Sequence, residues 1–410
     1  MAKKRVVIVG GGFGGLFTAL ELGSDVEVTL VSETDHFLFK PLLYEYLSGE
    51  VESWHIAPRY DELVDSHIQI KAGEVAAVDF ENREVQLSDG HKLPYDSLVL
   101  AVGATTNYAG VPGAAEYALP FRQLEDADRL RDRMTSALDA VAPNLPPQDA
   151  REALTFAVVG GGASGVELST KIADLLNDAF RRRALHGEPR VLVIEMGDRL
   201  VPGMGEEIRT YVESALRKSR VEAHTLTKVV EVAANSVTIE HEQARTKIPT
   251  AGVVWVGGVQ INPLIRQLDL PKVQRGLLNV RPTLQTISRD EVFALGDIAF
   301  VPDAAPTLAG TAQLALQEAR FVGKNIRAFL NGEKLHTTHF EELGEALSLG
   351  TERAAVLAGG KAFGGHLARQ ARFALYTSRL PTWHHRLRVG ASWFFEGNEP
   401  RPLLPLGYTR

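Results

Sequence analysis

The sequence predicts an α/β protein built from two parallel β-sheets covered by helices. One observation is a glycine-rich loop that occurs twice, at 10–15 and at 160–165, each time between an apolar run and an apolar, helix-like stretch. The other is that each copy leads, at similar spacing, to an apolar strand that meets a glycine, Gly103 or Gly257. Strands and helices that alternate in this way favour parallel sheets.

The first unit starts at about residue 5. Its expected elements are a strand at 6–9, a helix at 16–22, a strand at 26–31, a meander with turns at 81–82 and 89–90, and a strand at 98–102. Residues 125–150 read as a charged helix, and the proline-rich stretch 143–147 is expected to break the chain and lead into the second unit.

The second unit repeats the plan. Its expected elements are a strand at 154–159, a helix at 166–176, a strand at 191–195, a meander over 221–248 and a closing strand at 253–256. A further strand at 292–295 has no glycine-rich loop of its own. We therefore expect it to return to the first sheet, so that the second domain is inserted into the first.

Both loops fit the G-x-G-x-x-G pattern, whose glycines let the backbone approach a pyrophosphate at a helix N-terminus. The expected contacts are Gly10, Gly12, Phe13, Gly14 and Gly15 in the first loop, and Gly160, Gly162 and Gly165 in the second. A chain that builds this device twice is expected to hold two dinucleotides. The natural pair is FAD and NAD(P)H as co-substrate, with electrons passing from one to the other.

An acid at the end of the second strand of each copy would bind ribose hydroxyls. In the first copy either Ser32 or Glu33 stands there; we favour Glu33, and a solvated turn is the alternative. In the second copy Glu195 ends the strand. A carboxylate there favours NADH, although Arg199 nearby leaves NADPH open.

Polar residues after the returning strand suggest further contacts. Asp297 follows Gly296 at the strand end, where it is expected to bind flavin hydroxyls or simply to form a turn. Gln313 and Gln317 lie four residues apart on one face of a predicted helix at 309–319, near a flavin or along a solvated stripe. Glu167 opens the second long helix, either as a favourable charge at its N-terminus or as a buried proton relay.

Composition excludes several chemistries. The 410 residues contain no cysteine, which rules out thiolate metal sites, iron–sulfur clusters and a redox-active cysteine pair. The twelve histidines show no metal-binding spacing, so we expect no metal. The net charge of −7 disfavours a nucleic-acid partner.

The C-terminal stretch 361–395 has no aspartate or glutamate, although it is rich in arginine and aromatic residues. Such a basic, aromatic stretch is typical of a segment that lies in a membrane interface. Pro381 should divide it into two short elements. A dimer contact or a lid over the core is the alternative.

The chain resembles the type II NAD(P)H:quinone dehydrogenase family, which are monotopic flavoproteins of the glutathione-reductase-like fold with two dinucleotide-binding domains. The resemblance rests on 39–45, 101–104, 165–167, 294–297 and 312–317. The stretches 47–59 and 379–394 resemble its cyanobacterial and plastid branch, implicated in prenyl-quinone metabolism that includes demethylphylloquinone reduction on the way to vitamin K1. Ser32 stands where many relatives carry an acid.

The resemblance implies a discontinuous FAD-binding domain (1–120 and 281–345), an NAD(P)H-binding domain (121–280) and a membrane-interface segment (346–410). It implies that Glu167, Gln313 and Gln317 serve the nicotinamide and quinone sites. The cofactor-binding residues expected beyond the loops are Glu33, Lys40, Pro41, Val75, Ala101, Gly103, Glu195, Gly257, Gly296, Asp297, Ala312 and Gln313.

The expected activity is that of an FAD-dependent NAD(P)H:quinone oxidoreductase that pumps no protons and reduces a prenyl quinone of the demethylphylloquinone, phylloquinone or plastoquinone class. We expect it on the cytoplasmic side of a thylakoid or plasma membrane. The alternatives are a soluble reductase of a protein carrier and a nucleotide-binding redox sensor. The native quinone, the preferred nicotinamide and the oligomeric state, a homodimer included, are left open.

Overall fold

A computed structural model describes residues 3–141, 145–185, 187–302 and 309–403. The chain divides into two compact units. Unit 1 comprises Met1–Phe39, Ala57–Thr105 and Val259–Leu343, and unit 2 comprises Lys40–Ile56, Thr106–Gly258 and Gly344–Arg410.

Unit 1 is built on a five-stranded sheet in the order β19-β7-β1-β2-β3. The strands are β1 (Lys4–Val9), β2 (Val26–Ser32), β3 (Ile68–Ala72), β7 (Ser97–Leu100) and β19 (Val292–Ala294). All neighbouring pairs are parallel. The predicted return of the strand near residue 292 to the first sheet is therefore confirmed, because β19 pairs with β7.

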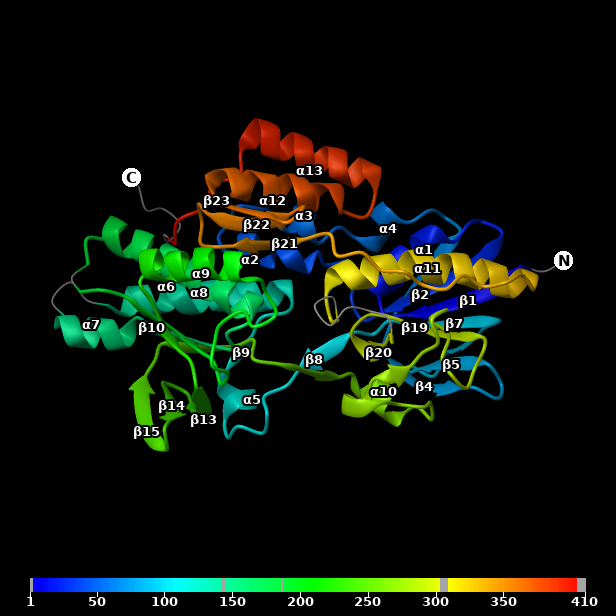
Figure 1. The fold of residues 1–410 in the computed structure, drawn as a ribbon, viewed down its shortest axis with the longest axis horizontal. Coiled ribbons are helices and arrows are strands. Elements are labelled where there is room, and N and C mark those ends of the chain that lie inside the picture. The colour runs from blue at the N-terminus through cyan, green and yellow to red at the C-terminus, as the bar shows by residue number, and fades with distance from the viewer. Residues whose placement is uncertain (1–2, 142–144, 186, 303–308, 404–410) are drawn as a thin grey trace. The chain divides into compact units, whose positions relative to one another are not determined.

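Helices α1 (Phe13–Glu21) and α11 (Ala312–Asn331) pack together in unit 1, as Figure 1 shows. Close packing is possible because Gly323 lies against Glu21, where a Cβ would come within 2.5 Å of the glutamate Cβ. The Thr311 hydroxyl caps α11 by accepting the Leu314 N–H, and Gly332 ends the helix in a left-handed conformation.

Smaller elements complete unit 1. They include α4 (Tyr60–Leu63), β4 (Val75–Asp79), β5 (Glu84–Leu87), β6 (Lys92–Pro94), β17 (Val259–Ile261), α10 (Pro263–Gln267), η2 (Gln274–Gly276), β18 (Leu278–Asn279), η3 (Gly296–Ile298) and β20 (Ala299–Phe300). Strands β4 to β6 form the predicted antiparallel meander.

Unit 2 repeats the parallel sheet, in the order β12-β11-β10-β16-β9. The strands are β9 (Leu119–Pro120), β10 (Thr155–Val159), β11 (Arg190–Ile194), β12 (Val221–His224) and β16 (Gly252–Trp255). Figure 1 shows α6 (Leu124–Ala140), α8 (Ala163–Arg182) and α9 (Glu206–Ser219) on one side of it. The antiparallel sheet of β13 (Thr227–Ala233), β14 (Ser236–His241) and β15 (Ala244–Pro249) lies on the other.

The C-terminal part of unit 2 packs near α8 and α9. It consists of the antiparallel strands β21 (Glu345–Ser348), β22 (Ala354–Ala358) and β23 (Lys361–Gly365), followed by α12 (His366–Ser378) and α13 (Trp383–Glu396). The predicted break at Pro381 is confirmed, because it lies between α12 and α13. The N-terminal segment contributes η1 (Lys40–Leu42), α2 (Leu43–Leu47) and α3 (Ser53–Ile56) to this unit.

Several expected elements differ in extent from the prediction. The charged stretch 125–150 forms two helices, α6 and α7 (Pro147–Ala153), because Pro147 opens a new helix at its first position. The expected break lies partly outside the described residues. Helix α8 begins three residues earlier than predicted, since its first turn is formed by the glycine-rich loop itself. No helix among the described residues has the length and apolar character needed to cross a bilayer.

Candidate functional site

The first loop in unit 1 has the geometry of a phosphate cradle. Gly10 has φ +105, and a Cβ there would lie 2.4 Å from the Ala101 carbonyl oxygen. A Cβ on Gly15 would lie 1.7 Å from the Gly10 carbonyl oxygen. A Cβ on Gly12, by contrast, would meet no described atom within 4 Å, so the loop leaves space in front of its backbone. These residues fit the pyrophosphate of a dinucleotide.

The side chains beside this loop differ in their packing and burial. Phe13 packs edge-on against Phe37 and Phe39, with ring centroids 5.1 and 5.4 Å apart. Ser32 is buried and its hydroxyl lies 3.1 Å from the Tyr60 hydroxyl, which donates to the Gly11 carbonyl. Glu33 is exposed. The expected ribose contact of Glu33 stays a prediction, and Ser32 is the residue that faces the loop.

Asp297 and Gly103 meet at the end of the first sheet. Gly103 has φ +65, and a Cβ there would lie 4.0 Å from Asp297 Oδ2. Gly296 also has a left-handed φ, +74, and donates its N–H to Glu318 Oε2 at 2.6 Å. Sequence reasoning missed Glu318, because a glutamate inside a helix carries no signal of burial.

Gln313 and Gln317 bind the backbone of one residue, Glu341. The Gln313 and Gln317 side-chain amides donate to the Glu341 carbonyl at 3.2 and 2.9 Å, and the Glu341 N–H returns a bond to Gln317 Oε1 at 2.9 Å. Both side chains therefore hold the segment after α11 in place. Their roles near the nicotinamide and quinone stay predictions, as does that of Ala312, the first residue of α11.

The second loop, in unit 2, repeats the cradle. Gly160 has φ +110, and a Cβ there would lie 2.5 Å from the Gly257 Cα. A Cβ on Gly165 would lie 1.7 Å from the Gly160 carbonyl oxygen, whereas one on Gly162 would meet no described atom within 4 Å. The second loop therefore fits a dinucleotide for the same reason as the first.

Glu195 is fixed at the end of β11 by two backbone groups. Its Oε2 accepts the Gly161 N–H and its Oε1 accepts the Gly197 N–H, both at 2.6 Å. The Val201 N–H binds the Gly161 carbonyl at 2.8 Å, which ties the following segment to the loop. The carboxylate is thus held beside the cradle, and its expected contact with ribose hydroxyls stays a prediction.

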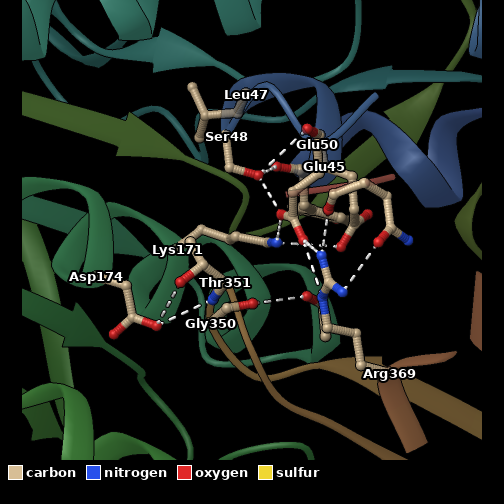
Figure 2. A network of polar contacts seen from close by, with 12 residues as sticks. Glu45, Leu47, Ser48, Glu50, Lys171, Asp174, Gly350, Thr351 and Arg369 are labelled. Atoms are coloured by element: carbon tan, nitrogen blue, oxygen red, sulfur yellow. Dashed lines mark hydrogen bonds and ion pairs between the residues drawn. The ribbon is translucent and has the colours of Figure 1, made fainter. Parts of the chain in front are cut away.

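A buried cluster of six charged side chains lies within unit 2, as Figure 2 shows in part. We call it the charge cluster. Its members are Glu45, Glu50, Glu167, Lys171, Arg369 and Arg372. Three carboxylates face three cations, so the cluster is neutral when every member is ionised. Buried charges are tolerated only when they are paired in this way.

The ion pairs of the charge cluster form a continuous series. Arg369 binds Glu50 at 2.8 Å, and Lys171 contacts both Glu50 and Glu45. Arg372 binds Glu45 at 2.8 Å with one terminal nitrogen. Its other terminal nitrogen donates to the Pro41 carbonyl at 2.8 Å and to Glu167 at 3.3 Å. The series links α2, α8 and α12.

Glu167 has the most useful chemistry in the charge cluster. Burial, together with the Glu45 charge, raises its pKa to about 7, although Arg372 and the Ser348 N–H at 2.8 Å oppose the shift. For Glu45, burial alone would raise the pKa, but Arg372 and Lys171 outweigh it and lower the pKa to about 2. Glu45 therefore stays ionised while Glu167 can gain or lose a proton near neutral pH.

The remaining predicted cofactor residues stay predictions. Lys40 is exposed at the start of η1, Pro41 follows it, and Val75 opens β4 as a buried residue. The basic tail is divided: Arg369 and Arg372 are 4% and 2% exposed, within the charge cluster, so they do not face a membrane. Sequence reasoning missed their burial, because their acidic partners lie more than 200 residues away.

A surface of exposed apolar side chains covers parts of α12 and α13. We call it the apolar surface, and its members are Leu367, Trp383, Leu387, Phe394 and Phe395. Phe394 and Phe395 are each 82% exposed. Large exposed apolar side chains on two neighbouring helices are typical of an interaction site.

Comparisons with known proteins identify the family of the chain. The profile of the pyridine nucleotide-disulphide oxidoreductase family matches residues 4–319. Demethylphylloquinone reductase NdbB of Synechocystis sp. is 37% identical over 405 residues, covering 96% of each chain. Type II NADH:quinone oxidoreductase NdhA of Mycobacterium tuberculosis is 31% identical, covering 95% of this chain and 86% of that protein.

The fold matches a solved structure over nearly the whole chain. NDH2 from Plasmodium falciparum, in complex with NADH, aligns with a TM-score of 0.86 at 20% identity, covering 98% of this chain and 100% of that chain. At 20% identity, this structural match establishes the fold alone. Together with the family profile and the full-length relatives, it establishes that the chain belongs to the pyridine nucleotide-disulphide oxidoreductase family, in its type II NAD(P)H:quinone oxidoreductase group.

Proposed function

We propose that this protein is an FAD-dependent NAD(P)H:quinone oxidoreductase that reduces a prenylated quinone at a membrane surface. The observation that carries the proposal is the pair of phosphate cradles in a chain without cysteine. Because the chain has no redox-active thiol, electrons that pass between the two dinucleotides must leave to an external acceptor. The names of the full-length relatives support a quinone as that acceptor.

The two cradles are proposed to bind different dinucleotides. The loop at 10–15 with Asp297 would hold FAD, and the loop at 160–165 with Glu195 would hold NAD(P)H. Bound FAD would supply the two-electron redox chemistry that links NAD(P)H to the acceptor. The chain's own contribution is to bind and orient these groups and to supply protons.

Glu167 is the residue that we propose to supply a proton. Reduction of a quinone to a quinol consumes two protons, and a general acid works best when its pKa lies near the working pH. Burial, opposed by Arg372, raises the pKa of Glu167 to about 7. Arg372 and the Ser348 N–H both bind its Oε1, which fixes the carboxyl group.

The quinone is proposed to belong to the demethylphylloquinone, phylloquinone or plastoquinone class. The relative that is 37% identical is a demethylphylloquinone reductase, and the alignment covers 96% of both chains. We place the enzyme on the cytoplasmic side of a thylakoid or plasma membrane, where such quinones are dissolved.

The apolar surface is the proposed membrane contact. Trp383, Phe394 and Phe395 of this surface are exposed to solvent. Arg379, Arg386 and Arg388 lie on α13 or between α12 and α13. Arginines beside aromatic rings favour an anionic lipid surface. Arg388 also packs over Trp54, with its guanidinium 5.2 Å from the ring centroid.

Steady-state kinetics with both nicotinamides across naphthoquinones and benzoquinones tests the proposal. We expect prenylated naphthoquinones to be reduced with the highest kcat/KM. Turnover with a soluble protein carrier or oxygen but no quinone would instead favour a soluble reductase. Negligible turnover with every acceptor, despite bound FAD that NADH bleaches, would favour a redox sensor.

A further inference from the structure

A buried carboxyl group in unit 1 has no part in the proposed chemistry. Glu318 lies on α11 and its side chain is 0% exposed. Its Oε2 accepts the Gly296 N–H at 2.6 Å, and its Oε1 is buried without a hydrogen-bond partner among the described residues. Burying a polar atom without a partner is costly, so this arrangement needs an explanation.

The bond from Gly296 to Glu318 holds the turn that carries Asp297. Gly296 has φ +74, a conformation that other residues rarely adopt. On the strand side the turn is held by the Leu295 N–H, which binds the Leu100 carbonyl at 3.2 Å. Glu318 holds it on the helix side. Glu318 therefore helps to hold the turn from which Asp297 projects.

The charges around Glu318 favour its neutral form. Burial foremost, and then the charge of Asp297, raise its pKa to about 8, against the opposing Gly296 N–H. From α1, the charged side chain against α11 is Glu21, which lies beside Gly323 farther along the helix. No lysine or arginine of the described chain is among the groups that shift its pKa. A neutral acid also gives Glu318 an O–H that can donate, which a carboxylate lacks.

We propose that Glu318 is a positioning residue for FAD: as the neutral acid it holds the Gly296–Asp297 turn, and it weakens FAD binding when it ionises. The inference rests on FAD binding by the loop at 10–15 and Asp297. It predicts that the affinity for FAD falls in alkaline solution because Glu318, which lies behind the cofactor-binding turn, ionises. Ionisation would place a buried negative charge beside the half-buried Asp297 and unbalance the hydrogen bonding of the turn.

The test measures the FAD dissociation constant of the holoprotein by flavin fluorescence between pH 6.5 and 9.5. Wild-type affinity should fall at least about tenfold over this range, following the ionisation of one group. Glu318→Gln keeps an acceptor for the Gly296 N–H and cannot ionise. It should bind FAD within about threefold of wild type at pH 6.5 and show no decline above pH 8.

Glu318→Ala and Glu333→Gln complete the set. The alanine variant leaves the Gly296 N–H unpaired and should bind FAD about 10- to 100-fold more weakly at every pH. Glu333 is exposed beyond the end of α11, so Glu333→Gln should behave as wild type. If the alanine variant does not fold, the comparison of Glu318→Gln with wild type still tests whether ionisation of Glu318 weakens FAD binding.

The possible results separate this inference from the proposed function. An equal pH dependence in wild type and Glu318→Gln would overturn the role of ionisation. Wild-type affinity in a folded Glu318→Ala would overturn the positioning role. Wild-type protein that binds no FAD at all would overturn the proposed function, and this inference with it.

Discussion

Replacing Glu167 by glutamine tests the proposed proton donor. Both contacts of the carboxyl group go to Oε1, from the Ser348 N–H at 2.8 Å and from Arg372 at 3.3 Å. A glutamine can present its amide oxygen to the same two donors, so the fold should survive. The variant loses the proton that titrates with a pKa of about 7, together with the negative charge that the ionised carboxyl group presents to Arg372. A positioned general acid contributes about 10²- to 10⁴-fold to a rate, so quinone reduction should slow by about 100-fold or more.

Stopped-flow measurement separates the two half-reactions of this variant. Flavin reduction by NADH should stay within about threefold of wild type, because hydride transfer needs no protein acid. The wild-type rate of quinone reduction should fall as pH rises through about 7, since the protonated fraction of Glu167 falls, and Glu167→Gln should be slow and flat. Glu207→Gln, an exposed position on α9, is the control. Unchanged rates in both half-reactions, or an unchanged pH profile, would refute the assignment.

Three further predictions concern the charge cluster, the second cradle and the apolar surface. Arg372→Ala leaves two buried carboxylates without their guanidinium. It should therefore lower the free energy of unfolding by about 3–5 kcal/mol, which a lower thermal unfolding midpoint would reveal. An unchanged midpoint would contradict the ion pairing. Glu195→Ser removes the charge that repels a 2′-phosphate and should raise the ratio of kcat/KM for NADPH over NADH by about tenfold or more; a constant ratio would show that the preference is set elsewhere. Phe394→Ser with Phe395→Ser should weaken flotation with anionic liposomes by about 10- to 100-fold, if each ring is half-buried in the interface; full flotation of the double variant would argue against this surface.

The double variant is preferable to deleting the C-terminal segment. Arg369 and Arg372 lie on α12 and complete the charge cluster. Removing the chain beyond residue 360 would leave Glu45 and Glu50 buried without these partners. A loss of membrane binding in a truncated protein could then reflect unfolding rather than a lost membrane contact.

The sequence allows local features of this protein to be predicted. The two cradles follow from glycine spacing, since Gly10 and Gly160 need positive φ angles that few other residues adopt. Glu195 follows from its place at a strand end. The return of β19 to the first sheet follows from an apolar strand that lacks a phosphate loop of its own.

Contacts between distant segments could not be predicted in the same way. Arg372 pairs with Glu45, which is 327 residues away in the sequence, and Arg369 pairs with Glu50 at a separation of 319. No periodicity or motif links such positions. For the same reason the tail arginines read as one basic surface, although α12 turns two of them into the protein interior. The burial of Glu318 likewise depends on the packing of α11, which its own sequence does not reveal.

An anaerobic titration of the purified protein tests the central claim most directly. The account predicts a yellow protein with one FAD per chain, which stoichiometric NADH or NADPH bleaches and a prenylated naphthoquinone recolours without any further protein. A colourless protein that takes up no FAD, or a reduced flavin that the quinone leaves bleached, would contradict it.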